Sequence, residues 1–242
     1  MFGLDEWIAR SSDGTTLLIV VAVAALLGLR HATDPDHLAA VAALIAIDDD
    51  RSGQAARRLS LVWGLGHATT LFVFGLPIVF YSAYLPEPVQ QGAEAAVGVM
   101  IVALAVWLLV RWRCGTFHPH AHTHVHEHRA GGHGHGHPPG RRTPLGAYAI
   151  GLVHGMGGSA GVGLVLLAEI QRRVVAMTAL AVLALFTAVS MWIVSAGWGL
   201  ALSRPSVRRS PDRVTPALGL AGLAFGVWYA LGALTLVPYW EI

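Results

Sequence analysis

The chain is organised around eight consecutive residues, Arg30-His31-Ala32-Thr33-Asp34-Pro35-Asp36-His37. These residues put ionisable side chains between two apolar runs, residues 17–27 and residues 38–47. Charged side chains cost a few kcal/mol each in a lipid-spanning helix, so they indicate function there. Pro35 lacks an N–H group and its ring clashes with the carbonyl four residues earlier, so a helix is predicted to break here. Imidazoles and carboxylates at a broken mid-membrane helix predict a binding site for a divalent cation.

The composition indicates an all-α integral membrane protein. Of the 242 residues, 55% are hydrophobic and 12% are charged, whereas soluble domains carry about 25% charged residues. The formal net charge of +2 is too small to indicate nucleic acid as a partner. The single cysteine, Cys114, excludes an internal disulfide and a metal cluster held by thiolates. The lipid bilayer is therefore the first partner that the composition predicts.

Six apolar segments are long enough to cross a bilayer, which takes roughly 20 residues. We predict about six transmembrane helices, at residues 16–47, 59–81, 93–112, 145–170, 174–202 and 216–238. The first segment is too long for one simple helix, so it is predicted to be broken at the polar stretch. Twelve of the 16 basic residues, all arginine, lie in the loops after the first, third and fifth segments. Arginine-rich loops stay on the inner side, so these loops are predicted to be cytoplasmic, with both termini outside the cell membrane.

Short matches indicate an internal repeat in the sequence. Gly28-Leu29-Arg30-His31 aligns with Gly151-Leu152-Val153-His154 at an offset of 123, and Val106-Trp107 aligns with Val227-Trp228 at an offset of 121. Two halves of three helices each must lie in opposite orientations in the membrane. The fold is therefore predicted to be an inverted 3+3 repeat, with the substrate site where the halves meet. Chance matching among helices rich in Ala, Leu, Gly and Val is the alternative.

A histidine-rich segment separates the two predicted halves. Residues 1–112 form the first membrane half, residues 143–242 form the second, and residues 113–142 form a cytoplasmic loop between them. The loop contains nine histidines: His118, His120, His122, His124, His126, His128, His133, His135 and His137. Its Gly, Pro and alternating His leave nothing to pack, so the loop is predicted to be disordered. Such tracts capture Ni²⁺, Co²⁺, Cu²⁺ or Zn²⁺ through neutral imidazole, and a solvated linker is the alternative.

The other four of the 13 histidines lie inside apolar segments and are His31, His37, His67 and His154. A protein that used histidine incidentally would scatter some of them over its surface, so this distribution indicates metal handling. His67 follows two glycines that allow a close helix crossing, and a hydrogen bond between helices is the alternative role for it. His154 precedes a run of small residues that suits an unwound turn or a close helix contact.

The spacing of the first motif limits which residues can bind the same ion. His37 follows His31 by six positions, about 240° of rotation on a helix, so a straight helix points the two rings apart. They can share an ion only if the helix unwinds at Asp34-Pro35; otherwise they serve different sites or steps. Asp34 lies one turn from both rings and is predicted to accept a hydrogen bond from a ligating imidazole. The predicted metal residues are His31, Asp34, Asp36, His37, His67 and His154.

These motifs resemble those of the nickel/cobalt transporter family. The stretch from His31 to His37 matches its H-x4-D-H signature, and the sequence LGHATT around His67 is similar to its second signature. The resemblance implies metal selection by the two histidines of the first motif and Asp36, with His67 in support. Residues 154–160 replace a later motif of that family and look like the urease-accessory-type branch of nickel permeases. The histidine-rich loop is similar to that of nickel/cobalt efflux proteins, and typical members have eight transmembrane helices rather than about six.

The resemblance implies transport of Ni²⁺ or Co²⁺ across the cytoplasmic membrane, with the ion as substrate and no prosthetic cofactor. The sequence contains neither G-x4-G-K-[ST] nor H-E-x-x-H, so the chain is predicted to hydrolyse no ATP and to be no enzyme. Uptake is the expected direction. The alternatives are nickel/cobalt efflux, an intramembrane zinc metalloenzyme and a metal sensor. Predicted partners are divalent metal ions, the lipid bilayer and cytoplasmic metallochaperones of a nickel or cobalt enzyme, with no nucleic acid.

Overall fold

The computed structural model describes residues 4–47, 53–81, 86–114, 143–157, 170, 172–208 and 210–238. All regular structure in this part of the chain is helical: α1 (Leu4–His31), α2 (Pro35–Ile47), α3 (Gly53–Tyr81), α4 (Glu87–Arg113), α5 (Pro144–His154), α7 (Arg173–Ser203), α8 (Pro205–Arg208) and α9 (Pro211–Ala233). The predicted all-α fold is confirmed. The nine clustered histidines lie outside the described residues, so the disorder and metal capture of their loop stay predictions.

Four of the described helices, α3, α4, α7 and α9, are long and apolar enough to cross a membrane. α1 and α2 pass the same test together, as a pair bent by 50° at a short break. The chain is therefore a multi-pass membrane protein whose first predicted span is broken, as expected. The helix predicted over residues 145–170 is wrong as one continuous element, because α5 ends at His154 after 11 residues. Residues 158–169 lie outside the described part of the chain.

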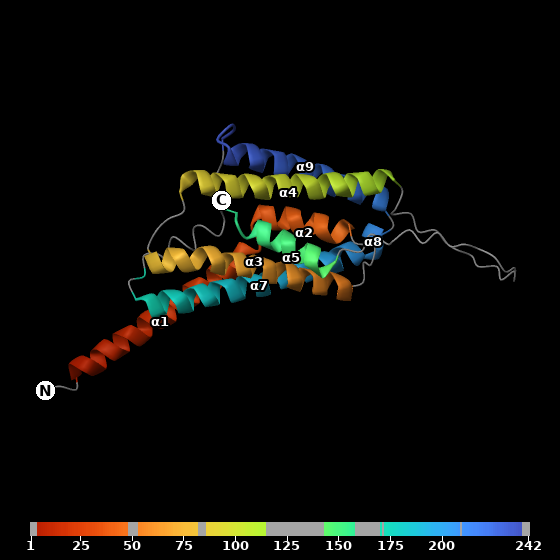
Figure 1. Ribbon diagram of the computed structural model, residues 1–242. Coiled ribbons are helices and arrows are strands. Elements are labelled where there is room, and N and C mark those ends of the chain that lie inside the picture. Colours follow the sequence, from red (N-terminus) through yellow and green to blue (C-terminus); the bar gives the residue numbers. More distant parts are fainter. Residues whose placement is uncertain are drawn as a thin grey trace.

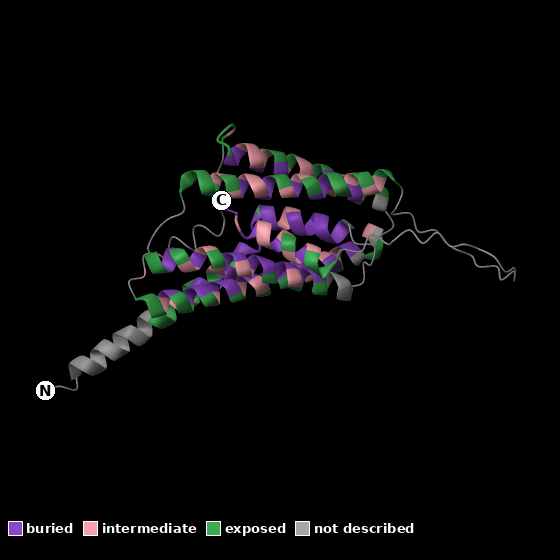
Figure 2. Ribbon diagram, viewed as in Figure 1, coloured by how far each residue is buried: buried purple, intermediate pink, exposed green. Residues whose placement is uncertain are grey.

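Two groups of helices enclose α2 and α5 (Figure 1). α4 and α9 pack together along one side, and α1 and α3 both pack against α7 on the other. α2 touches α4, α9 and α7, while α5 packs mainly against α3. Figure 2 shows α2 as almost wholly buried, and residues 40–46 are all buried side chains. The 13 residues of α2 rise about 20 Å, less than the ~30 Å hydrocarbon core, so α2 alone is too short to cross the membrane.

Equivalent hydrogen bonds relate the two halves of the fold. Thr70 Oγ1 on α3 donates to the carbonyl oxygen of Leu152 on α5 over 2.9 Å. Ser190 Oγ on α7 donates to the carbonyl oxygen of Leu29 on α1 over 2.6 Å. Ser190 lies 120 positions after Thr70, and Leu152 lies 123 positions after Leu29, which is the offset of the sequence repeat. Each hydrogen bond thus fixes the last turn of a helix that ends in the repeated histidine.

Close glycine contacts follow the same relation. A Cβ at Gly151 of α5 would overlap the carbonyl oxygen of Trp63 on α3. A Cβ at Gly28 of α1 would lie 2.7 Å from the carbonyl oxygen of Leu183 on α7. No side chain larger than hydrogen fits at either position without moving a helix. α5 is therefore held tightly to α3, and α1 is held tightly to α7.

α4 and α9 meet at two equivalent close contacts, one toward each end of their interface. A Cβ at Gly98 would lie 2.7 Å from the Cβ of Ala230, and a Cβ at Gly219 would lie 2.6 Å from Cδ2 of Leu109. Gly219 follows Gly98 by 121 positions, and Ala230 follows Leu109 by 121 positions. Residue numbers rise along α4 as they fall along α9, so the two helices are antiparallel. This pairing is the one that an inverted repeat of two three-helix halves predicts.

Candidate metal centre

The break between α1 and α2 creates the centre of the site. α1 ends at His31, after which Thr33 N and Asp34 N donate to the carbonyl oxygens of Arg30 and His31 over 2.8 and 3.2 Å. Pro35 is the first residue of α2, where its missing N–H and fixed φ are tolerated. Leu38 N then donates to the carbonyl oxygen of Asp34 over 3.1 Å and starts the new helix.

The bend at this break brings the two histidines of the first motif together. The ring centroids of His31 and His37 lie 4.4 Å apart, although a straight helix would point these rings in different directions. The predicted unwinding at Asp34-Pro35 is therefore what the structure shows, and it is what makes a shared ion sterically possible.

α3 contributes a third imidazole to the same point. His67 Nε2 lies 2.9 Å from His31 Nε2, and the His67 ring centroid lies 5.1 Å from that of His37. This contact is the interhelical hydrogen bond that was the alternative role for His67, provided that one of the two nitrogens carries the proton. The same separation of about 3 Å is also that of two adjacent ligands on an ion with metal–nitrogen bonds of about 2.1 Å.

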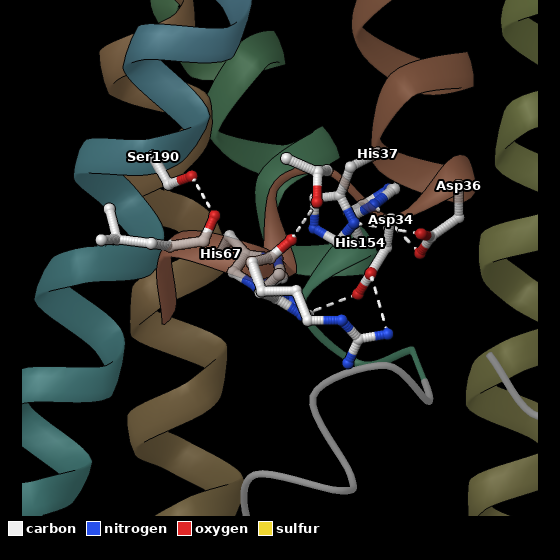
Figure 3. A network of polar contacts seen from close by, with 10 residues as sticks. Asp34, Asp36, His37, His67, His154 and Ser190 are labelled. Carbon is white, nitrogen blue, oxygen red and sulfur yellow. Dashed lines mark hydrogen bonds and ion pairs between the residues drawn. The ribbon is translucent and has the colours of Figure 1, made fainter. Parts of the chain in front are cut away.

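α5 adds His154, whose ring also lies against that of His37. The two ring centroids lie 4.1 Å apart, and His154 Nε2 lies 3.5 Å from Asp36 Oδ2. Asp36 Oδ1 lies 3.1 Å from His37 Nδ1, so one carboxylate faces both imidazoles. Figure 3 shows Asp36, His37 and His154 side by side at the helix break.

Asp34 occupies a different position from the other carboxylate. Its Oδ2 lies 3.4 Å from Nδ1 of His31, and its Oδ1 lies 3.8 Å from the guanidinium of the mostly exposed Arg30. Asp34 is thus placed to orient the His31 ring, as predicted for one of the two histidines. No contact between Asp34 and His37 is found among the described residues, so of the two rings that lie one turn away Asp34 faces that of His31.

The cluster is buried and only partly satisfied. The four histidines and both aspartates are at most 6% exposed. Among the described residues, His37 Nε2, His67 Nδ1 and His154 Nδ1 have no hydrogen-bond partner, while Asp36 Oδ2 and His154 Nε2 face each other at 3.5 Å. A buried polar atom without a partner costs about 1 to 3 kcal/mol, so three such atoms in one place indicate a binding site.

A tryptophan that the sequence motifs did not single out lies against the site. Trp63 sits one turn before His67 on α3 and is 1% exposed. Its ring centroid lies 6.0 Å from that of His37 and 5.5 Å from that of His154, and its indole N–H has no partner among the described residues. In the sequence, only the position of Trp63 one helical turn before His67 indicates that it lies near the site.

Thr187 is the counterpart of His67 in the second half. Its backbone nitrogen would lie 2.9 Å from a Cβ at Gly28, just as the nitrogen of His67 would lie 3.0 Å from a Cβ at Gly151. Thr187 is fully buried, and within the described residues its hydroxyl has no partner. The repeat therefore carries an imidazole on α3 and a hydroxyl at the same place on α7.

Fold and site together define a multi-pass membrane protein with a buried cluster of metal-binding side chains at a broken helix, the arrangement of a transporter. A model of the family NicO, high-affinity nickel-transport protein, matches residues 17–202. The chain belongs to this family of nickel-transport proteins. It is also 22% identical over 160 residues to the urease accessory protein UreH of Bacillus sp. (strain TB-90). This alignment covers 66% of this chain and 67% of that protein. No solved structure matches the chain.

Proposed function

We propose that the chain transports Ni²⁺, Co²⁺ or both across the cytoplasmic membrane through the buried cluster of His31, Asp36, His37, His67 and His154. The observation that supports this most is the convergence of four imidazoles and a carboxylate, in which three ring nitrogens have no hydrogen-bond partner among the described residues. Neutral imidazole and carboxylate oxygen suit Ni²⁺ and Co²⁺, and these ligands replace the water that the ion sheds on entry. Membership of the nickel-transport family supports the same conclusion.

The proposed path leads from the outer surface through the cluster to the histidine-rich loop on the cytoplasmic side. Both termini are then outside, and the loop collects the ion for cytoplasmic metallochaperones. Arg30 and Thr33 are exposed beside the buried Asp34, so the polar end of α1 is where the cluster approaches the surface. The arginine-rich loops favour this orientation.

Accumulation of radiolabelled Ni²⁺ in cells that express the protein tests this proposal. We expect the wild type to accumulate Ni²⁺ above cells with an empty vector, and His37→Ala to abolish the difference. Leu65→Ala, on a half-exposed side chain two residues before His67, is the control and should behave as the wild type. Unlabelled Co²⁺ and Zn²⁺ added as competitors rank the metals.

The direction of transport follows from the same assay. Accumulation below that of the empty vector, again dependent on His37, would mean efflux and would refute uptake. No dependence on His37 in either direction, with expression confirmed, would refute transport through this cluster.

A further inference from the structure

We propose that the cluster is two overlapping subsites for the ion that share His37, and that the ion passes from one to the other during transport. The three-histidine subsite consists of His31, His37 and His67. The mixed subsite consists of Asp36, His37 and His154. This inference rests on the proposed function, and it adds an order of events to it.

The three-histidine subsite is compact enough to hold one ion. One nitrogen from each ring can be chosen so that all three lie within 4.8 Å of one another. Nitrogens on opposite sides of an ion with bonds of about 2.1 Å are about 4.2 Å apart, so small rotations of the rings close this set. His31 and His67 already meet at 2.9 Å through their Nε2 atoms.

The mixed subsite has the same compactness with different chemistry. One oxygen of Asp36 and one nitrogen each of His37 and His154 also lie within 4.8 Å of one another. Asp36 adds a negative charge that the three-histidine subsite lacks. The two subsites therefore differ in ligand type, and each is incomplete without His37.

The geometry does not favour one site made of all five residues. Among the described residues, the sets whose ligand atoms all lie within 4.8 Å of one another are the two triads, and the five residues together do not form such a set. His37 lies close to every other ring, with centroids 4.4 Å from His31, 5.1 Å from His67 and 4.1 Å from His154. The ring of His37 is thus the one group that can stay bound while the other ligands exchange.

The two subsites draw their ligands from different helices. The three-histidine subsite joins α1, α2 and α3, whereas the mixed subsite joins only α2 and α5. A small change in the separation of α1 and α3 therefore opens the first subsite and leaves the ligands of the second in place. The ion then exchanges His31 and His67 for Asp36 and His154, with no change in its oxidation state.

Equilibrium binding of Ni²⁺ to the purified full-length protein in detergent tests the two subsites. His67→Ala and His154→Ala should each still bind one Ni²⁺ with an affinity within about tenfold of the wild type, since one subsite stays intact. The double variant and His37→Ala should lose affinity by roughly 100-fold or more, since neither subsite is then complete. Both single variants should nevertheless lose most of their Ni²⁺ transport, because each lacks one step.

X-ray absorption at the nickel edge provides the second readout. Nickel bound to His154→Ala should show three imidazoles, and nickel bound to His67→Ala should show two imidazoles with an added oxygen. Three imidazoles in both variants, with equal losses of affinity, would mean a single site and would overturn the proposal. His67→Gln and His154→Gln repeat the test with polar side chains if either alanine variant fails to elute as the folded protein.

The outcomes separate this inference from the proposed function. If His37→Ala abolishes transport while His154→Ala transports as the wild type does, the passage between subsites is refuted and transport through the cluster stands. If Ni²⁺ transport is independent of His37, the proposed transport through the cluster is refuted, and the passage between subsites is refuted with it.

Discussion

Gly151→Ala tests whether the close contact of α5 with α3 sets the position of His154. The added methyl group would overlap the carbonyl oxygen of Trp63 and would lie 3.0 Å from the nitrogen of His67. To restore ordinary van der Waals contact, α5 must move by roughly 1 Å. Metal–ligand distances tolerate about 0.2 Å, and His154 is only three residues further along the same helix. The imidazole is then displaced by several times what the site tolerates.

We expect Gly151→Ala to lower Ni²⁺ transport by roughly 10- to 100-fold, because misplacing a functional group by 1 Å costs up to about 100-fold. The assay is accumulation of radiolabelled Ni²⁺ per amount of protein in the membrane. Gly92→Ala is the matched control, since a Cβ there meets no atom within 4 Å. Helix propensity favours alanine in both variants by about 1 kcal/mol, so a difference between them reports the steric effect. Transport by Gly151→Ala within twofold of the control would refute this reasoning.

Three further predictions concern the helix break, the paired hydrogen bonds and the orientation. Pro35→Ala lets α1 continue as a helix and turns the flanking histidines apart, so Ni²⁺ accumulation should fall about tenfold, and unchanged accumulation would contradict the role of the break. Thr70→Val and Ser190→Ala each remove one of the equivalent hydrogen bonds, so each should lower the free energy of unfolding by about 0.6 to 1 kcal/mol, measured as thermal unfolding in detergent; an unchanged midpoint would contradict this. Cys114, the exposed single cysteine after α4, should react with a membrane-impermeant maleimide only after the cytoplasmic membrane is opened, and labelling in intact cells would invert the proposed orientation.

Local chemistry made the centre of the site predictable from the sequence. Pro35 without an N–H required a break in the helix, and the break in turn allowed His31 and His37 to face each other. The repeat was also visible, because the second copy of the motif ends in His154 at the same offset. Short-range rules of helix geometry were sufficient for these features.

Contacts between separate helices were not predictable in the same way. The rotation of α5 about its axis, which places His154 against Asp36 rather than away from it, depends on the packing of Gly151 on Trp63. The end of α5 at His154 was missed because the apolar sequence continues beyond it. Trp63 gave no signal beyond its place on the helix, since a buried tryptophan is as common in packing as in a site.

The position of Asp34 shows the same limit. Sequence distance placed it one turn from both His31 and His37, yet the bend directs its carboxylate to His31 and Arg30. Because the break rotates the two sides of the motif against each other, spacing on an ideal helix could not decide between the two rings.

Flux of Ni²⁺ into liposomes that contain only the purified protein tests the central claim most directly. A nickel-sensitive dye inside the liposomes reports entry, with His37→Ala and Leu65→Ala liposomes measured in parallel. Transport through the cluster predicts Ni²⁺ entry with the wild type and Leu65→Ala, and none above empty liposomes with His37→Ala. Equal entry with His37→Ala, or no entry with the wild type, would contradict transport of the ion through the buried histidine cluster.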